Sequence, residues 1–289
     1  MSLWHVVILA IIQGLTELLP VSSSAHVVVA EKLLGLNPSS PPMTLLLVML
    51  HTGTMFAVIV YFWSQWRDTY FENMAAFKKF AGLVVLATAL TGLFGGALIK
   101  IIEKTAFRGV PHGEIENLFS HLELIAPALA VAGILILIAG ILDRRSPAGS
   151  SAKTNNLNAK QAGIIGTVQG LCLPFRGFSR SGATISAGML AGVAKSRAEA
   201  FSFALAVVLT PPVVAREALR LVRAEHITGT ANLASAAFPS LLGAVFAFFA
   251  GLLALKWLSR WLEHGRWHLF GIYCLAAAAV VGYLHYLGY

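Results

Sequence analysis

The fold is decided by a polar break in an apolar arm near the N-terminus, Gln13–His26, which reads QGLTELLPVSSSAH. The apolar arm Leu3–Leu19 leads into it, and a shorter apolar arm, Val27–Leu34, follows it before Gly35. The second arm is too short to cross a bilayer, because a span takes roughly 20 apolar residues. Irregular backbone at membrane depth is tolerated only where protein or a water-filled cavity covers it. The stretch therefore predicts a helical hairpin that enters and leaves on one side and lines a cavity.

A second break in the other half of the chain has the same pattern. It lies in Gln169–Thr184, which reads QGLCLPFRGFSRSGAT, and it interrupts the apolar arms Ala162–Leu173 and Ala183–Val193 from Pro174 through Gly182. Both breaks run Gln-Gly-Leu, then a proline, then serines that open a short helix. The second stretch therefore predicts a second re-entrant hairpin.

The composition around these breaks is that of a membrane protein. The chain has 289 residues, of which 57% are hydrophobic and only 12% charged, and its mean hydropathy is +0.75. Soluble domains carry about a quarter charged residues. A soluble enzyme, a disordered chain and a disulfide-rich module are excluded, which leaves a polytopic membrane protein. Six further stretches are predicted to span: Met43–Trp63, Phe80–Ile102, Leu122–Leu142, Ala198–Ala215, Phe238–Trp257 and Trp267–Tyr286.

Each half then holds one hairpin and three spans, so the fold class is an all-α polytopic membrane protein. The halves are 1–150, with the re-entrant hairpin 3–35, and 151–289, with the hairpin 162–194. Because three spans is an odd number, the second half must be inverted relative to the first. Interrupted segments at matching places in inverted repeats point to a binding site near the membrane midplane.

The basic residues fit this topology better than they fit a nucleic-acid surface. The formal net charge is +8, but the basic residues are scattered between apolar runs without interleaved aromatic residues, so no nucleic acid is expected as a partner. Cys172 and Cys274 imply neither a disulfide framework nor a metal cage.

The loop charges predict the orientation of the helices. Twelve lie on one side: Arg67, Lys78, Lys79, Arg144, Arg145, Lys153, Lys160, Lys195, Arg197, Lys256, Arg260 and Arg266. Seven lie on the other: Lys32, Lys100, Lys104, Arg108, Arg216, Arg220 and Arg223. The side with twelve is expected to be cytoplasmic, which puts both termini outside.

The two breaks bring polar groups suited to an anion. Serines at a helix start leave unpaired N–H groups that favour negative charge, and Arg180 adds a planar fork of donors suited to phosphate. Glu17 and Arg180 would together oppose membrane insertion by about 5–7 kcal/mol. We therefore predict that the breaks converge to form a cradle for a phosphate or a diphosphate.

Structural alternatives remain open for several of these residues. Ser22 and Ser181 are also typical helix N-caps. Glu17 is alternatively one partner of a structural salt bridge, and His26 a buried core histidine. His51, halfway along the first span, either lines the cavity or serves helix packing.

The two motifs, in this order and spacing, resemble the bacterial undecaprenyl-diphosphate phosphatase family of the bacitracin-resistance type. The resemblance covers the chain and includes Phe201-Ser202-Phe203. It implies a multi-pass hydrolase of the bacterial inner membrane that removes the terminal phosphate of undecaprenyl diphosphate, giving undecaprenyl phosphate for peptidoglycan synthesis, cell-wall biogenesis and cell shape. It also implies a membrane-lipid substrate for which bacitracin competes, and hence antibiotic resistance.

The resemblance also assigns residues. The acidic motif of the family falls on Gln13 and Glu17, where a divalent cation, Mg²⁺ or Ca²⁺, is expected. The implied catalytic residues are Glu17, Ser23, His26 and Arg180. The expected phosphate-binding residues are Ser22, Ser179, Arg180, Ser181 and Thr184.

The chain departs from the family pattern at two places. Gln13 leaves only one carboxylate in the acidic motif, and Arg176 stands where the family commonly has proline, its own proline being the earlier Pro174. Contact of Arg176 with a second phosphate and exposure to lipid headgroups are both open. Glu31 and Lys32, near the end of the first short arm, are expected at the membrane interface.

The mechanism expected from the sequence is phosphoryl transfer by positioning and charge. Ser23 Oγ would attack and His26 or Glu17 would take its proton; direct attack by His26 or by water stays open. The active site is expected to open to the periplasmic face. A flippase for a prenyl phosphate lipid would use the same inverted repeats and anion site, and whether the chain forms a homodimer stays open.

Overall fold

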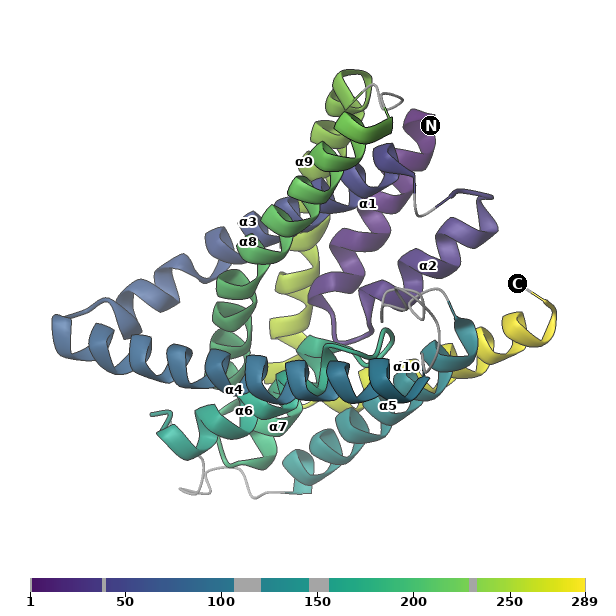
Figure 1. The fold of residues 1–289 in the computed structure, drawn as a ribbon. Coiled ribbons are helices and arrows are strands. Elements are labelled where there is room, and N and C mark those ends of the chain that lie inside the picture. Colours follow the sequence, from purple (N-terminus) through teal and green to yellow (C-terminus); the bar gives the residue numbers. More distant parts are fainter. Residues whose placement is uncertain (1, 38–39, 107–120, 146–155, 229–232, 289) are drawn as a thin grey trace.

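The computed structural model describes residues 2–37, 40–106, 121–145, 156–228 and 233–288, and within these ranges every regular element is an α-helix (Figure 1). The predicted boundary between residues 150 and 151 lies outside the described residues, as do Arg108 and Lys153. The helices are α1 (Leu3–Leu18), α2 (Ser23–Leu33), α3 (Pro41–Tyr70), α4 (Met74–Ala106), α5 (Leu122–Arg145), α6 (Ala159–Cys172), α7 (Arg180–Leu190), α8 (Lys195–Thr228), α9 (Leu233–Glu263) and α10 (Trp267–Tyr286).

Six of the described helices are long and apolar enough to cross a membrane: α3, α4, α5, α8, α9 and α10. Each contains one of the six stretches predicted from the sequence, so a helix long and apolar enough to span is confirmed at each predicted place. Their apolar windows are at least 18 residues long, and a rise of about 1.5 Å per residue carries such a helix through most of a bilayer core.

The other four described helices are short and form two pairs, α1 with α2 and α6 with α7. They have 16, 11, 14 and 11 residues. The breaks fall where the sequence places them, but α2 begins at Ser23, four residues before the predicted start of the second arm at Val27. The reason is that Ser22 takes the N-cap position, so that Ser23, Ser24 and His26 all lie in the first turn of the helix.

The two pairs are held by similar helix packing. The helix α1 packs along α9, and α6 packs along α4. A Cβ atom added to Gly14 of α1 would lie 2.7 Å from the carbonyl oxygen of Ala247, and one added to Gly170 of α6 would lie 2.8 Å from that of Thr91. The glycine of each Gln-Gly-Leu motif therefore lets one short helix lie against the backbone of a spanning helix.

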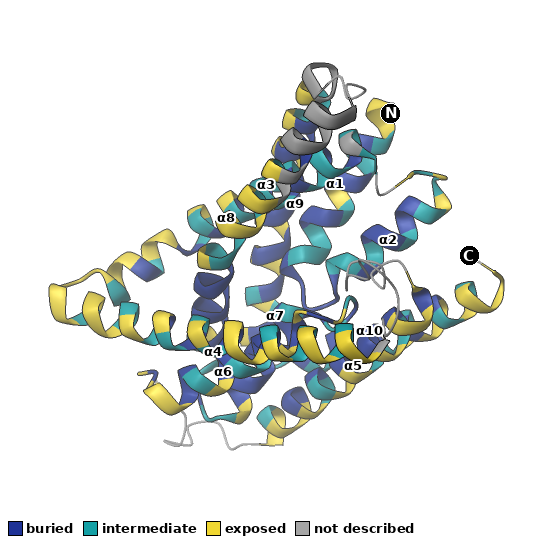
Figure 2. Ribbon diagram, in the orientation of Figure 1, coloured by how far each residue is buried: buried dark blue, intermediate teal, exposed yellow. Residues whose placement is uncertain are grey.

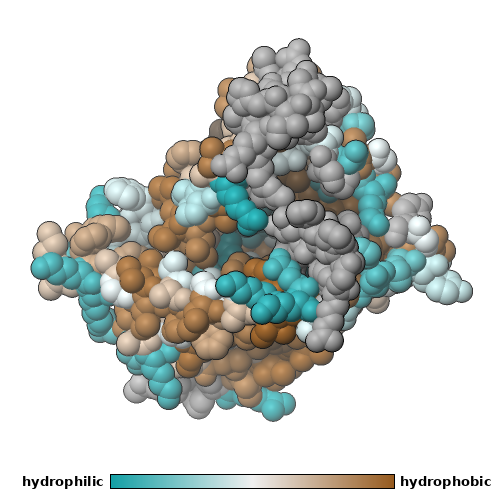
Figure 3. All heavy atoms as spheres, in the orientation of Figure 1, coloured by the Kyte–Doolittle hydropathy of each residue, from teal (hydrophilic) through white to brown (hydrophobic). Residues whose placement is uncertain are grey.

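Burial separates the centre of the molecule from its outer helices. All nine residues of α7 from Ser181 to Met189 are buried, whereas α4 is largely exposed (Figure 2). On the coloured part of the face seen in Figure 3, apolar surface covers a broad area, and hydrophilic side chains lie in smaller groups among it and at its edges. Many of the exposed side chains are large and apolar, such as Leu93 of α4 and Leu253 of α9, which is the surface that a lipid environment stabilises.

Candidate active site

Both short second helices begin at a serine with unusual backbone geometry. Ser22 has a φ of 67° and Ser179 a φ of 48°, and within the described residues these are the only positive φ angles outside glycine. Such angles cost free energy in a non-glycine residue and gather at functional sites. Ser179 caps α7, since its Oγ accepts from the N–H of Gly182 at 3.3 Å. Ser22 occupies the cap position of α2 without a side-chain cap bond, and Ser181 lies inside α7 and is not its N-cap.

The two breaks meet, as the sequence predicts. Ser24 Oγ accepts a hydrogen bond from the backbone N–H of Gly177 at 3.3 Å. In the opposite direction, Ser181 Oγ donates to the carbonyl oxygen of Leu19 at 3.3 Å. Each break therefore holds the backbone of the other through the serine two residues beyond its cap.

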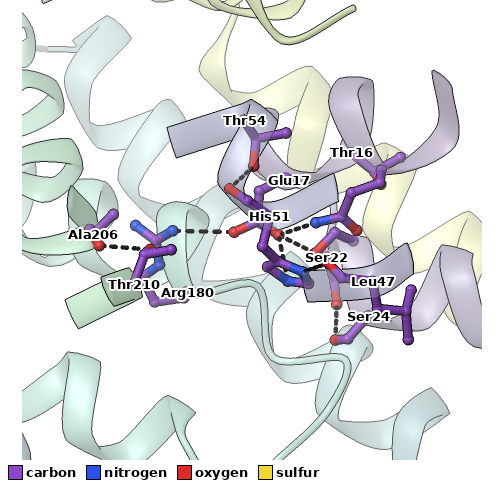
Figure 4. A network of polar contacts seen from close by, with 12 residues as sticks. Thr16, Glu17, Ser22, Ser24, Leu47, His51, Thr54, Arg180, Ala206 and Thr210 are labelled. Carbon is purple, nitrogen blue, oxygen red and sulfur yellow. Dashed lines mark hydrogen bonds and ion pairs between the residues drawn. The ribbon is translucent and has the colours of Figure 1, made fainter. Parts of the chain in front are cut away.

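The side chain of Glu17 is the centre of the site (Figure 4). Its Oε2 accepts from Ser23 Oγ at 2.5 Å and from Gln13 Nε2 at 3.1 Å. Its Oε1 accepts from Arg180 Nη2 of the second break at 3.3 Å. The ring of His51 on α3 completes the group, with Nε2 3.8 Å from Glu17 Oε2. Four elements thus converge on one carboxylate.

The charges around Glu17 keep it ionised. Burial raises the pKa of this carboxyl, but the charges of His51 and Arg180 and the hydrogen bonds from Ser23 and Gln13 outweigh burial and hold the pKa below its ordinary value. Arg180 keeps one hydrogen-bond donor available for a ligand, because its Nη1 is buried and has no hydrogen-bond partner among the described residues. The site therefore offers an ionised carboxylate beside a hydroxyl, and a guanidinium with a free donor.

His26 lies in the same break but does not contact Ser23. Its Nδ1 is 2.8 Å from the carbonyl oxygen of Ser22, and its Nε2 is 2.7 Å from the hydroxyl of Tyr273 on α10. Burial lowers the pKa of His26, although the bond to Ser22 opposes this, so the ring is neutral near pH 7. Of the two predicted proton acceptors for Ser23, the carboxylate of Glu17 is the one that its hydroxyl contacts.

Thr184 is completely buried, and its hydroxyl braces α7. Its Oγ1 is 2.7 Å from the carbonyl oxygen of Arg180 and 2.6 Å from Ser202 Oγ on α8, and both side chains are fully covered. The contact joins the first turn of α7, which carries Arg180, to a spanning helix. Contact of Thr184 with a phosphate stays a prediction.

Arg176 and Glu31 link the two pairs at a second place. Glu31 is 1% exposed and its Oε1 has no hydrogen-bond partner among the described residues; its expected place at the membrane interface stays a prediction. Burial raises the pKa of Glu31 to about 7, and the charge of Arg176 opposes that rise. The physical reason is that the C-terminal part of α2 packs into the protein, with the half-buried Arg176 of the second break near it.

Sequence reasoning did not single out two contact residues and left a third open. His51 had a signal, since a histidine halfway along an apolar span is costly. Ser202 lay in a stretch noted only for the family resemblance, and Tyr273 had no signal at all. The contact of Tyr273 with His26 joins residues 247 positions apart in the sequence.

In the part of the chain that the structure describes, protein groups alone do not form a metal cage. Within the described residues, no group of three or more His, Cys, Asp or Glu side chains is placed to hold a metal ion. Near Arg180, the first break supplies one carboxylate, Glu17, and one amide, Gln13. Mg²⁺ is commonly bound by one or two carboxylates together with substrate phosphates, so this donor set fits a cation shared with a bound diphosphate.

Together these features define a class of protein, a polytopic helical membrane protein in which two short helix pairs meet at one charged cluster. Residues 6–280 match the family model described as bacitracin resistance protein BacA, and the chain belongs to this family. It is 60% identical to undecaprenyl-diphosphatase 2 of Acinetobacter baylyi, over 97% of each chain. It is 35% identical to undecaprenyl-diphosphatase 2 of Burkholderia thailandensis and to undecaprenyl-diphosphatase 1 of Burkholderia pseudomallei, in each case over 96% of this chain and 95% of the relative.

Proposed function

We infer that this protein is an undecaprenyl-diphosphate phosphatase, which hydrolyses undecaprenyl diphosphate to undecaprenyl phosphate and inorganic phosphate. The observation that carries the inference is the meeting of the two breaks at Glu17, which places a hydroxyl and a guanidinium on one carboxylate. The relatives named undecaprenyl-diphosphatase, at up to 60% identity over nearly the whole chain, support the same activity.

The reaction begins at Ser23. Glu17 accepts the proton of the Ser23 hydroxyl, and Oγ attacks the terminal phosphorus of the diphosphate. The bond between that phosphorus and the bridging oxygen breaks, and undecaprenyl phosphate leaves. Water then hydrolyses the phosphoserine and releases inorganic phosphate. The 2.5 Å contact between Ser23 Oγ and Glu17 Oε2 supports this assignment, and attack by His26 or directly by water remains the alternative.

Arg180 and the two helix starts hold the diphosphate. The unpartnered Nη1 of Arg180 is a donor for a phosphate oxygen. The uncapped first turn of α2 after Ser22 adds backbone N–H groups, and the positive end of α7 beside Ser179 and Ser181 adds its dipole. Because phosphoryl transfer depends mainly on positioning and charge, these contacts supply most of the catalysis.

A divalent cation, Mg²⁺ or Ca²⁺, would be held by Glu17, with Gln13 beside it, and by oxygens of the substrate. When bound, it supplies positive charge that offsets the charge developing on the phosphate oxygens. The protein groups alone hold Ser23, Gln13 and Arg180 around the carboxylate.

The architecture that we propose is a pair of inverted repeats, 1–150 and 151–289, each with a re-entrant hairpin and three spans. Support comes from matching packing, because α1 lies on α9 as α6 lies on α4, and α5 pairs with α10. The matching positions of Gly14 and Gly170 and of Ser22 and Ser179 support it further. The excess of basic loop residues supports a cytoplasmic-membrane orientation with the active site open to the periplasmic face.

In the cell, this reaction recycles the lipid carrier of peptidoglycan synthesis, and bacitracin competes for the same lipid. Membership of the family of bacitracin resistance proteins supports both statements. A carrier that flips prenyl phosphate lipids is not favoured, because transport needs no hydroxyl bonded to a carboxylate such as the Ser23–Glu17 pair. A homodimer stays a proposal, and no contact among the described residues supports it.

Phosphate release by purified protein in detergent tests the proposal. Wild type with Mg²⁺ or Ca²⁺ is expected to release phosphate from a prenyl diphosphate. Glu17→Ala, Ser23→Ala, His26→Ala and Arg180→Ala are expected to be severely impaired. The matched controls Ser64→Ala and Arg67→Ala lie in the exposed part of α3 and are expected to keep the wild-type rate. No release by wild type, with lipid transport retained in vesicles, would instead establish a carrier.

A further inference from the structure

Tyr273 of α10 is the one described side chain outside the two breaks that contacts His26 through both its ring and its hydroxyl. The phenol oxygen is 2.7 Å from His26 Nε2. The two rings are stacked, with centroids 5.7 Å apart and planes at 11°. Stacking fixes the plane of the imidazole, and the hydroxyl fixes its rotation within that plane.

The partners of His26 determine which nitrogen carries the proton. The carbonyl oxygen of Ser22 only accepts hydrogen bonds, so Nδ1, at 2.8 Å, must carry the N–H. In the neutral ring Nε2 then has a lone pair, and the hydroxyl of Tyr273 donates to it. The Ser22 carbonyl thus makes Nε2 the basic nitrogen of the ring, and the Tyr273 hydroxyl orients that nitrogen by donating to it.

The helix α10 is a rigid base for this contact because it is tied to both short helix pairs. The Sγ of Cys274, the next residue, donates to the carbonyl oxygen of Pro20 at 3.3 Å. Nearer the start of α10, Trp267 Nε1 donates to Ser186 Oγ of α7 at 3.0 Å. The helix also packs closely on α5, since a Cβ atom added to Gly271 would lie 2.6 Å from the backbone nitrogen of Leu137.

We propose that Tyr273 is a positioning residue of the phosphatase reaction, which acts by holding the ring of His26 with Nε2 as its proton acceptor. This inference rests on the proposed function, in which Glu17 takes the proton of Ser23, and it assigns His26 Nε2 the proton of the water that hydrolyses the phosphoserine. The hydroxyl yields Nε2 to the reacting groups when substrate binds, and the stacked ring keeps the imidazole in place. Tyr273 is half-exposed, so its hydroxyl has room to move.

The test is Tyr273→Phe, which keeps the stacked ring and removes only the hydroxyl. The matched control is Tyr283→Phe in the same helix, at an exposed tyrosine whose hydroxyl has no hydrogen bond among the described residues. Because a neutral hydrogen bond is lost, Tyr273→Phe is expected to lower kcat roughly 3- to 10-fold and to leave KM within about twofold of wild type. Tyr283→Phe is expected to match wild type in both constants.

A spectroscopic readout separates positioning from a general loss of structure. In ¹⁵N spectra of protein labelled at histidine, with the His26 signals assigned by their loss in His26→Gln, Nε2 is expected to be the unprotonated nitrogen at pH 7.5. Its shift is expected to move in Tyr273→Phe and to stay unchanged in Tyr283→Phe. An unprotonated Nδ1 in wild type, or an unchanged Nε2 shift in Tyr273→Phe, would overturn the proposal.

The kinetic constants also distinguish positioning by Tyr273 from a direct effect of its hydroxyl on substrate binding. A lower KM with unchanged kcat in Tyr273→Phe would show that the hydroxyl competes with substrate, and a higher KM alone would show that it binds phosphate; both overturn positioning. If His26→Ala is impaired while Tyr273→Phe equals Tyr283→Phe, only this inference fails. If His26→Ala is as active as wild type, the part proposed for His26 fails with it.

Discussion

The helix pairs α1–α2 and α6–α7 have the same backbone arrangement, which we call the frame. They differ in the polar side chains that they carry. In both, the second helix begins after a left-handed serine, Ser22 or Ser179. In both, the serine two positions beyond that cap reaches the other break, Ser24 to Gly177 and Ser181 to Leu19. The frame is therefore reciprocal, and each pair positions the other.

The difference lies at the positions between these shared points. One residue after the cap, the first pair has Ser23 and the second has Arg180. Four residues after the shared glutamine, the first pair has Glu17 and the second has Leu173. The first pair thus carries the acid and the hydroxyl, and the second carries the cation that balances the acid. The shared residues set the geometry, and the proposed reactive site arises from the residues that differ.

The largest effect on kcat is expected from Ser23, whose surroundings differ from those of the adjacent Ser24. Ser23→Ala removes the hydroxyl on Glu17 and is expected to lower kcat by about 10³-fold or more, as loss of a nucleophile does. Ser24→Ala removes the contacts of this hydroxyl with Gly177 and with Ser22 Oγ and is expected to lower kcat less than about tenfold. Phosphate release measured on both variants makes the comparison, and equal losses would contradict the division between chemistry and frame.

How much of this is visible in the sequence depends on the range of the interaction. The spans and the breaks follow from local composition, and the meeting of Glu17 with Arg180 follows from a motif that occurs twice. The early start of α2 depends on the backbone of Ser22, which no local pattern reveals. The burial of Glu31 and the contact of Tyr273 depend on how distant helices pack. Pairings of that kind are set by the tertiary structure and leave no periodic signal.

The guanidinium of the second pair can be tested without removing its charge. Arg180→Lys keeps one positive charge but loses the fork in which Nη2 contacts Glu17 and Nη1 stays free. The expected result is a fall in kcat/KM of about 10²-fold. Arg67→Lys, at an exposed arginine of α3, is the matched control and is expected to have no effect. An Arg180→Lys variant with wild-type kcat/KM would show that only net charge matters.

The buried Glu31 of α2 predicts a dependence of stability on pH. The pKa of Glu31 rises from 4.5 to about 7 on folding, so the folded protein holds this proton more tightly than the unfolded chain does. Stability is therefore full at low pH and falls as pH rises from 4.5 to 7, by up to about 3 kcal/mol. Glu31→Gln is expected to raise Tm at pH 8 and to leave it nearly unchanged at pH 5. The same Tm difference at both pH values would contradict this.

The shared glycines test the frame itself. Gly14→Ala and Gly170→Ala each push a methyl group against the backbone of a spanning helix and are expected to destabilise the protein by about 1–3 kcal/mol. Gly92→Ala of α4 is the control, because a Cβ atom there meets nothing within 4 Å, and it is expected to be neutral or slightly stabilising. Thermal unfolding in detergent measures all three. A harmless Gly170→Ala beside a damaging Gly14→Ala would mean that the two pairs are held differently.

The smallest effect is expected at the two left-handed serines, where the frame is the same and the side chains act differently. Glycine adopts a positive φ without the cost that a Cβ atom brings. Ser22 makes no cap bond, but its hydroxyl lies 3.3 Å from Ser24 Oγ. Relief of the backbone cost outweighs the loss of that contact, so Ser22→Gly is expected to stabilise the protein by about 0.5 kcal/mol. Ser179 caps α7 through Gly182, and the loss of that cap, a few tenths of a kcal/mol, offsets part of the gain in Ser179→Gly. A larger gain in thermal stability for Ser179→Gly than for Ser22→Gly would contradict this. It would show that the cap bond of Ser179 does not stabilise α7.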